Sequence, residues 1–286
     1  MLVTAGPLRP NNDRYAFEVK WDGFRALVAA RPNGVTVTSR NGHDMTSRYP
    51  ELQGLCHLAG QSIVLDGEIV CLDDDGKPDF AALWFRSRGS VSPTVCFMTF
   101  DILQLGDELV IDRPYRERRR ILDELNVNDS YWCTPAIHVG EGEALFAATR
   151  EMGLEGVVAK RLDSRYRPGL RSKSWTKTKH FQKRQFALLG WLPPEEWRGD
   201  RGCVVLGLRS DAGIAMAGVV ESGYGRDLVD QLPQLTRAEV RELQKPGRVW
   251  EGNDSLFGEV KFLEWSPAGG LRHATFISNK RNRATG

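Results

Sequence analysis

Apolar and polar residues alternate along residues 16–21, the pattern of a strand with one buried face. The pair Asp22-Gly23 follows at once and favours a tight hairpin turn, so residues 24–30 are predicted to form the returning strand. Lys20 then lies at the end of a strand with a fixed stem. If nearby cations and partial burial disfavour its charge, its amine can act as a nucleophile. On this stretch alone, an ordinary hairpin with a solvated lysine fits equally well.

Short strands and a few helices share the region that follows, up to about residue 184. Alternating or apolar runs predict strands at 35–39, 63–72, 94–105, 155–160 and 175–179. The sequence predicts a short helix from Pro50 and further helices at 79–85, 113–125 and 141–152. The mixture indicates an α+β domain over residues 1–184.

The pattern changes after residue 184, where strands dominate. Five strands are predicted at 186–192, 204–209, 214–220, 259–265 and 273–277, with one helical stretch at 226–243. Five short strands and one helix fit a small closed barrel of the oligonucleotide-binding (OB) type, and a small sandwich fits almost as well. The predicted second domain therefore covers residues 185–286.

Composition indicates a globular protein with room for two packed cores. The chain has 286 residues, of which 41% are hydrophobic. It shows neither an apolar run of membrane-spanning length nor a signal-peptide pattern at Met1, so a cytoplasmic protein is expected, with no membrane partner. Five scattered cysteines without a Cys-x-x-Cys pair are expected to be reduced thiols, and a zinc site is not expected.

Charge is distributed unevenly, although the formal net charge is only +2. Residues 160–184 hold ten Lys or Arg residues against the single acid Asp163. A basic block of this size suggests that one face binds a polyanion such as nucleic acid or a nucleotide. A long solvated loop would also explain it.

Several charged residues stand in or at the ends of otherwise apolar predicted strands: Lys20, Glu68, Glu155, Lys177 and Lys179. Each could be a strand-end residue that faces water. Together they supply what chemistry at phosphorus needs, namely fixed cations and carboxylates for a metal ion. Oxygen ligands without His or Cys suit Mg²⁺ or Mn²⁺ rather than zinc.

The order of motifs resembles that of the ATP-dependent DNA ligases, and most closely the compact bacterial ligases associated with end joining. The resemblance runs from about residue 2 to residue 277. The matching stretches are Glu18-x-Lys20-x-Asp22-Gly23-x-Arg25, Ser39-Arg40-Asn41-Gly42, Asp66-Gly67-Glu68, Phe100-Asp101-Ile102-Leu103, Glu155-Gly156-Val157-Val158-Ala159-Lys160 and Trp175-Thr176-Lys177-Thr178-Lys179.

The resemblance implies a nucleotidyltransferase domain of antiparallel sheets with helices, an ATP-grasp-like adenylation domain, followed by an OB-fold domain. Lys20 would attack the α-phosphate of ATP to form lysyl-AMP, and the AMP would pass to a 5′-phosphate that a 3′-hydroxyl then seals. Glu18 would lie beside the adenine and Phe100 would stack on it. Arg25 and Arg40 would hold the sugar and phosphate side of the nucleotide or the nick.

The same resemblance assigns the remaining site residues. Glu68 would contact the ribose or a metal ion, and Glu155 would bind a divalent cation. Lys177 and Lys179 would grip the α-phosphate. Backbone contacts without sequence preference are expected for duplex DNA. The helix at 113–125 offers further candidates for these contacts: Arg113, Arg116, Arg118, Arg119 and Arg120.

The chain departs from the family pattern at its last motif. The family has Arg-x-Asp-Lys there, which orients the pyrophosphate, whereas this chain has Lys280-Arg281-Asn282-Arg283. Because Lys lacks the bidentate grip of Arg, we expect slower self-adenylylation, with sealing of pre-adenylylated nicks retained. Two other functions remain open: an RNA ligase or capping-type nucleotidyltransferase, and a weakly active nucleic-acid-binding homologue.

The expected partners follow from the family. Nicked or broken duplex DNA is the expected substrate in DNA repair, with Ku-like and polymerase or primase proteins as further partners. A monomer associated with the nucleoid is expected. Whether the chain is free-standing or part of a longer polypeptide stays open.

Overall fold

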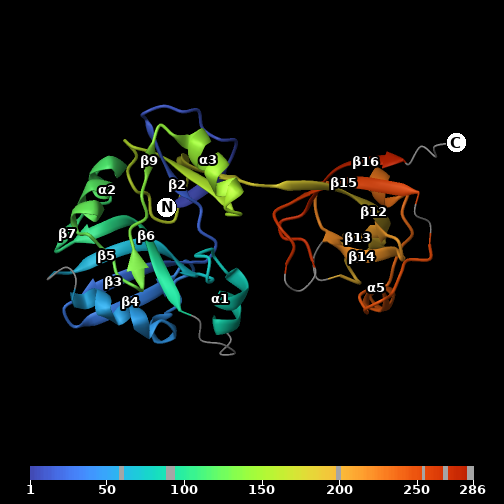
Figure 1. Cartoon of the computed structure of the whole chain (residues 1–286), viewed down its shortest axis with the longest axis horizontal. Coiled ribbons are helices and arrows are strands. Elements are labelled where there is room, and N and C mark those ends of the chain that lie inside the picture. Colours follow the sequence, from blue (N-terminus) through green and yellow to red (C-terminus); the bar gives the residue numbers. More distant parts are fainter. Residues whose placement is uncertain (58–60, 88–93, 198–200, 253–254, 267–269, 282–286) are drawn as a thin grey trace. The chain divides into compact units, whose positions relative to one another are not determined.

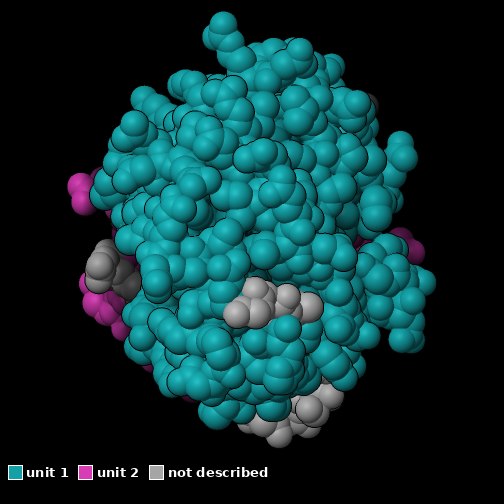
Figure 2. All heavy atoms as spheres, turned by 90° about the vertical axis from the view of Figure 1, so that its left-hand side faces the viewer, with its two compact units in different colours: residues 1–180 teal, residues 181–286 magenta. Residues whose placement is uncertain are grey.

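The computed structural model describes the whole chain except residues 58–60, 88–93, 198–200, 253–254, 267–269 and 282–286. The chain divides into two compact units, Met1–His180 and Phe181–Gly286 (Figures 1 and 2). The division falls a few residues before the predicted boundary at 184, because strand β12 (Gln182–Leu192) already belongs to the second unit. Among the described residues, no helix combines the length and the apolar character needed to cross a membrane.

The first sheet of unit 1 carries the strand that ends at Lys20. It has the order β1-β11-β10-β2-β9, in which only the β1–β11 pair is parallel. Helix α3 (Gly142–Glu151) packs on β2 and β10, where Phe17, Leu145, Val157 and Ala159 form a buried cluster. The strands are β1 (Leu2–Ala5), β2 (Tyr15–Val19), β9 (His138–Val139), β10 (Gly156–Arg161) and β11 (Arg171–Lys179).

The second sheet of unit 1 has the order β4-β3-β5-β6-β7 (Figure 1). The short β8 pairs in parallel with β6. Its strands are β3 (Phe24–Arg31), β4 (Gly34–Ser39), β5 (Ile63–Cys71), β6 (Val95–Leu105), β7 (Glu108–Leu109) and β8 (Trp132–Cys133). The short helices η1 (Thr46–Arg48), η2 (Pro50–His57) and α1 (Phe80–Ser87) cover its core, and α2 (Tyr115–Glu124) packs against β6.

The predicted hairpin at Asp22-Gly23 is wrong. Strand β2 pairs with β9 and β10, whereas β3 pairs with β4 and β5, so residues 20–23 cross from one sheet to the other. A Cβ atom at Gly23 would lie 2.1 Å from the carbonyl oxygen of Ile69. Glycine is therefore needed for this close passage between the sheets rather than for a hairpin turn.

Unit 2 is built on one antiparallel sheet with the order β14-β13-β12-β15-β16. Its further strands are β13 (Cys203–Ser210), β14 (Gly213–Val220), β15 (Leu256–Phe262) and β16 (Thr275–Arg281). The helical stretch predicted at 226–243 is in fact two helices, α4 (Arg226–Val229) and α5 (Arg237–Leu243), because Pro233 lies between them and Thr236 caps the second. The amide of Phe276 donates to the Ser222 carbonyl at 2.9 Å, so β16 and the end of β14 meet. The whole chain is an α+β protein.

Candidate functional site

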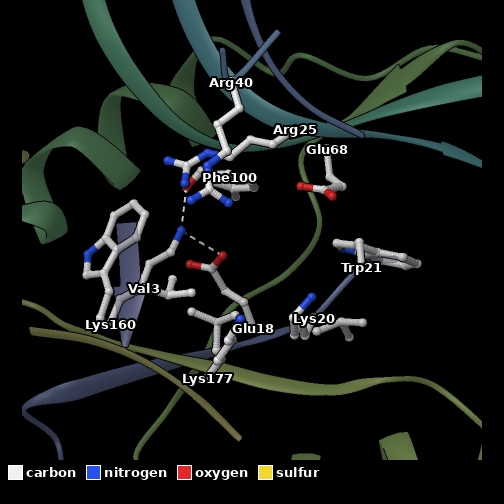
Figure 3. Close-up of a pocket in the computed structure, with 13 residues that line it drawn as sticks. Val3, Glu18, Lys20, Trp21, Arg25, Arg40, Glu68, Phe100, Lys160 and Lys177 are labelled. Carbon is white, nitrogen blue, oxygen red and sulfur yellow. Dashed lines mark hydrogen bonds and ion pairs between the residues drawn. The ribbon is translucent and has the colours of Figure 1, made fainter. Parts of the chain in front are cut away.

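A pocket of about 170 Å³ lies between the two sheets of unit 1. Figure 3 shows Arg25, Arg40 and Glu68 on one side of it, with Lys20 and Glu18 on the other. Seven of the nine predicted site residues line this pocket: Glu18, Lys20, Arg25, Arg40, Glu68, Phe100 and Lys177. The sequence analysis did not select the other lining residues, which are Val3, Val19, Trp21, Val158, Lys160 and Trp175.

The two predicted residues outside the lining, Glu155 and Lys179, are joined to it through Lys20. The buried Glu155 carboxylate forms ion pairs with the amines of both Lys20 and Lys179. Lys177 projects from the same strand as Lys179, and burial first, then the nearby Lys179 and Lys20, lower its pKa. The structure thus brings together four predicted residues from three segments of the chain: Lys20, Glu155, Lys177 and Lys179. Sequence spacing alone could not establish this.

The backbone next to Lys20 explains how these segments meet. The amide of Lys20 donates to the carbonyl of Gly156 at 2.9 Å, which ties the end of β2 to the start of β10. Gly156 has φ 145°, and a Cβ there would lie 2.1 Å from the Thr178 carbonyl oxygen. Glycine at this position lets β10 approach β11, and so places Glu155 between the two lysines.

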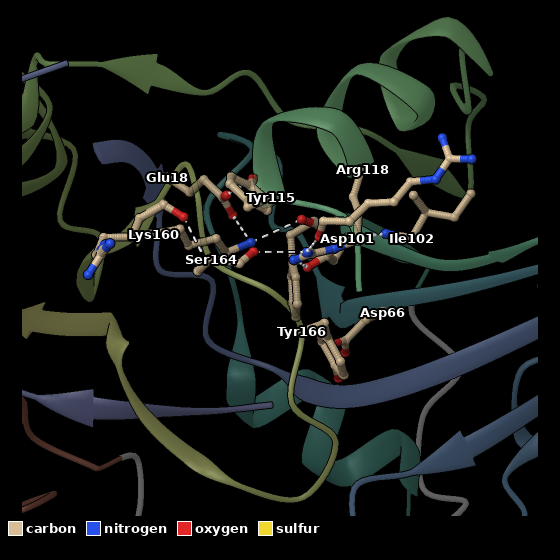
Figure 4. A network of polar contacts seen from close by, with 12 residues as sticks. Glu18, Asp66, Asp101, Ile102, Tyr115, Arg118, Lys160, Ser164 and Tyr166 are labelled. Atoms are coloured by element: carbon tan, nitrogen blue, oxygen red, sulfur yellow. Dashed lines mark hydrogen bonds and ion pairs between the residues drawn. The ribbon is translucent and has the colours of Figure 1, made fainter. Parts of the chain in front are cut away.

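A buried lysine holds Glu18. The Lys160 amine lies 2.8 Å from the Glu18 carboxylate and donates to the Phe100 carbonyl at 2.9 Å, and it is only 2% exposed (Figure 4). Its nitrogen lies 4.3 Å from the centre of the Trp175 ring and 4.8 Å from that of Tyr115, distances typical of cation–π contacts. The Tyr115 hydroxyl also donates to Glu18. Burial lowers the pKa of Lys160, and the charge of Glu18 opposes that shift.

Lys160 and Trp175 are the site residues that sequence reasoning missed. Both stand within stretches that carry the family resemblance, and Lys160 ends an otherwise apolar predicted strand. That position was the available signal, because a lysine at the end of a buried strand needs a partner.

The buried carboxylate of Asp66 fixes the position of the Arg25 side chain. Its guanidinium donates to both oxygens of Asp66, at 3.0 and 2.6 Å, and its centre lies 5.5 Å from the centre of the Phe100 ring. The Tyr166 hydroxyl donates to the same carboxylate at 2.8 Å (Figure 4). Burial, followed by the charge of Asp66, raises the pKa of Tyr166. Tyr166 also packs edge-on against Trp175, so it links the two walls of the pocket.

Glu68 and Glu155 are the oxygen donors that could hold a divalent cation. Burial raises the pKa of Glu68 to about 7, although Lys20 and Arg25 act in the opposite direction. In the part of the chain that the structure describes, no group of three or more His, Cys, Asp or Glu side chains is arranged for a metal ion. The two carboxylates therefore fit a hard cation only if phosphate oxygens or water complete its coordination.

Two of the arginines predicted to contact DNA are structural instead. Arg118 is fully buried and makes two 2.8 Å bonds to Asp101 (Figure 4), and Arg119 bonds Asp123 at 2.9 Å and the Pro135 carbonyl at 2.7 Å. The prediction for these two is wrong, because α2 presents them to the protein interior. Arg113 pairs with Glu108, whereas Arg116 and Arg120 are exposed.

The altered last motif is described only in part. Lys280 and Arg281 form the end of β16, where their backbones pair with Phe257 and Leu256. Asn282 and Arg283 lie outside the described residues.

Comparison with known proteins identifies the class that this fold and site define. Residues 7–179 match the model of the ATP dependent DNA ligase domain. The match covers more than half of the chain, and it includes every predicted site residue. The chain belongs to the family of ATP-dependent DNA ligases, which confirms the resemblance predicted from the motifs.

Individual relatives are found among bacterial end-joining proteins. The chain is 36% identical over 288 residues to "Multifunctional non-homologous end joining DNA repair protein LigD" of Mycobacterium tuberculosis, an alignment that covers 96% of this chain and 37% of that protein. It is 33% identical to "DNA ligase C1" of Mycolicibacterium smegmatis over 88% of this chain and 75% of the relative. The chain thus spans little more than a third of the length of its LigD relatives.

Solved structures of bacterial DNA ligases are also similar to this chain. The crystal structure of the ligase domain from M. tuberculosis LigD superposes with a TM-score of 0.61 at 32% identity, covering 98% of this chain and 93% of that one. A mycobacterial DNA ligase D complexed with ATP and MES gives a TM-score of 0.63 at 32% identity, with coverage of 99% and 94%.

Proposed function

We propose that this chain is an ATP-dependent DNA ligase that seals 5′-phosphate/3′-hydroxyl breaks in duplex DNA through a lysyl-AMP intermediate on Lys20. The observation that carries the proposal is the environment of Lys20: it lines one pocket together with Arg25, Arg40 and Lys177, and its amine contacts Glu155. Fixed cations around one amine favour attack on a phosphorus atom.

The reaction would proceed in three transfers. The Lys20 amine attacks the α-phosphorus of ATP, the bond from that phosphorus to the α,β-bridging oxygen breaks, pyrophosphate leaves with that oxygen, and the amine loses a proton. The AMP then passes to the 5′-phosphate of the DNA, which regenerates the free lysine. Finally the 3′-hydroxyl attacks that phosphate and AMP leaves. Lys177 and Lys179 would neutralise the charge that develops on the α-phosphate, since both lie on β11 next to Glu155 and Lys20.

Part of the pocket lining suits the adenine base of ATP. Phe100 and Trp175 offer aromatic surface, and Glu18 and Lys160 offer an acceptor and a donor in a fixed arrangement. Such a set can hold a planar heterocycle by stacking and hydrogen bonds. We assign Glu18 and Phe100 to the adenine, and Arg25 and Arg40 to the sugar and phosphate side.

Glu68 and Glu155 would hold Mg²⁺ or Mn²⁺ when nucleotide is bound. The cation supplies positive charge to the phosphate oxygens. Glu155 now pairs with Lys20 and Lys179, so a cation that binds Glu155 competes with both amines. Lys20, released from that ion pair, would be available to the phosphate.

We assign unit 1 to the adenylation domain and unit 2 to an OB-fold domain that binds DNA. Numbering the strands of unit 2 from one to five, the sheet order is 3-2-1-4-5, with helices between the third and fourth. Contact between the edge strands β14 and β16 would close a partly open barrel, and the Phe276–Ser222 hydrogen bond supports that closure. Exposed Arg116 and Arg120 would add backbone contacts to DNA.

The named relatives support a role in non-homologous end joining. As further partners we propose a polymerase or primase activity and a recruiting Ku-like protein, which only the family resemblance implies. The function is tested with a singly nicked duplex, ATP and Mg²⁺, beside a matched RNA nick and beside GTP. Sealing of the DNA nick with ATP, lost in Lys20→Ala, is expected. Preference for RNA ends or GTP would assign the chain to another nucleotidyltransferase class.

A further inference from the structure

A row of paired residues leads from the candidate site to a cluster of sulfur atoms. Across neighbouring strands of the second sheet, Arg25 on β3 pairs with Glu68 on β5, Glu68 with Met98 on β6, and Met98 with Cys133 on β8. Residues directly opposite each other in a sheet point to the same face. Arg25 and Glu68 line the pocket (Figure 3), so Met98 and Cys133 lie on the pocket's side of the sheet.

Three sulfur atoms converge at the end of this row. The Cys133 thiol donates to the Met98 sulfur at 3.2 Å. Cys96 stands two residues before Met98 on the same strand and therefore on the same face. A hydrogen bond joins the Cys96 and Cys133 thiols. Met98 is buried, whereas both cysteines are half-buried and so accessible to a small ion.

The chemistry of this cluster is that of a soft-metal site. Two thiols and a thioether supply three sulfur donors. In the described part of the chain, no set of three His, Cys, Asp or Glu side chains forms a metal site. Sulfur ligands of this kind favour monovalent copper, whereas structural zinc takes four ligands. The other three cysteines lie elsewhere, Cys56 and Cys71 in η2 and β5 and Cys203 in unit 2.

We propose that Cys96, Met98 and Cys133 bind one soft monovalent cation of the cuprous type, and that the bound ion inhibits the adjacent nucleotide site. Binding releases the thiol protons and draws the Met98 sulfur toward the two thiolates. Met98 is the cross-strand partner of Glu68, so its movement displaces a carboxylate that faces the pocket. The inhibitory part rests on the proposed ligase function, whereas the binding part does not.

Binding is tested by titrating the intact chain with Cu(I) under anaerobic, reducing conditions against a coloured Cu(I) chelator. We expect one tightly held equivalent in the natural chain and in the control Cys56→Ser, whose half-buried thiol lies outside the cluster. Cys96→Ser and Cys133→Ser should each lose it, and Met98→Leu should weaken it by about tenfold. Tight binding that survives in either serine variant would overturn the site.

The inhibitory effect is tested by AMP labelling of the same samples. One equivalent of Cu(I) should reduce labelling at least about tenfold in the natural chain and in Cys56→Ser but not in Cys133→Ser. If copper binds and labelling is unchanged, the coupling to Glu68 is refuted. If the metal-free chain cannot be labelled at all, the proposed ligase function fails, while the chelator titration still decides whether the metal site exists.

Discussion

Replacing Lys160 by Met should destabilise unit 1 strongly, because it leaves the Glu18 carboxylate buried without its cation. The lysine amine is 2.8 Å from Glu18, and the two side chains are 2% and 8% exposed. Removing one member of a buried ion pair costs about 3–5 kcal/mol. The Met side chain can fill the space between Phe100 and Trp175, and the Tyr115 hydroxyl still donates to Glu18, so we expect about 3 kcal/mol, the lower end of that range.

The double variant Glu18→Gln/Lys160→Met separates the charge from the packing. It removes the unpaired carboxylate and should recover roughly 1–2 kcal/mol of the loss. Because the chain has two compact units, stability is best measured locally, from the urea dependence of hydrogen exchange in peptides of β10 and β11. Lys173→Met, at an exposed position of β11, is the matched control and should change stability by less than about 0.5 kcal/mol. A Lys160→Met chain as stable as that control would refute the reasoning.

Three further predictions use the same pocket. Because the pKa of Glu68 is raised from 4.5 to about 7, the native carboxyl keeps its proton in a pH range where the unfolded one has lost it. The stability of unit 1 should therefore fall as pH rises through this window, and Glu68→Gln should remove that fall in the same exchange assay. Tyr166→Phe should raise the ATP concentration for half-maximal AMP labelling about fivefold with little change in maximal rate, since Arg25 loses a support worth roughly 1 kcal/mol; an unchanged ATP dependence would contradict this role. On helix α2, Arg118→Lys should cost about 3 kcal/mol in urea unfolding, whereas the exposed Arg120→Gln should stay within about 0.5 kcal/mol. Equal effects of the two would show that burial of Arg118 does not matter.

Local patterns predicted most strands of unit 1, because side-chain alternation depends only on the chain's own sequence. The runs at 24–30, 35–39, 63–72 and 94–105 correspond to β3, β4, β5 and β6. The same alternation does not predict which strands pair. Asp22-Gly23 favours a hairpin locally, but β2 pairs with β9 and β10, so this segment connects two sheets instead.

The candidate site was predictable where charged residues stand in apolar strands, as Lys20 and Glu68 do. Lys160 was missed because its burial depends on Glu18 and on three aromatic rings from separate segments. Arg118 was wrongly predicted to contact DNA, because an arginine-rich helix is typical of a solvent-exposed surface. Its partner Asp101 lies on a neighbouring strand, and only the fold brings the two together.

The most direct test of Lys20 as the nucleophile is the intact mass of the chain after incubation with ATP and Mg²⁺. A single added AMP is expected, located by peptide mapping on Lys20 and missing from Lys20→Arg. Labelling of that variant to the same extent, or AMP found on another residue of the natural chain, would contradict the account.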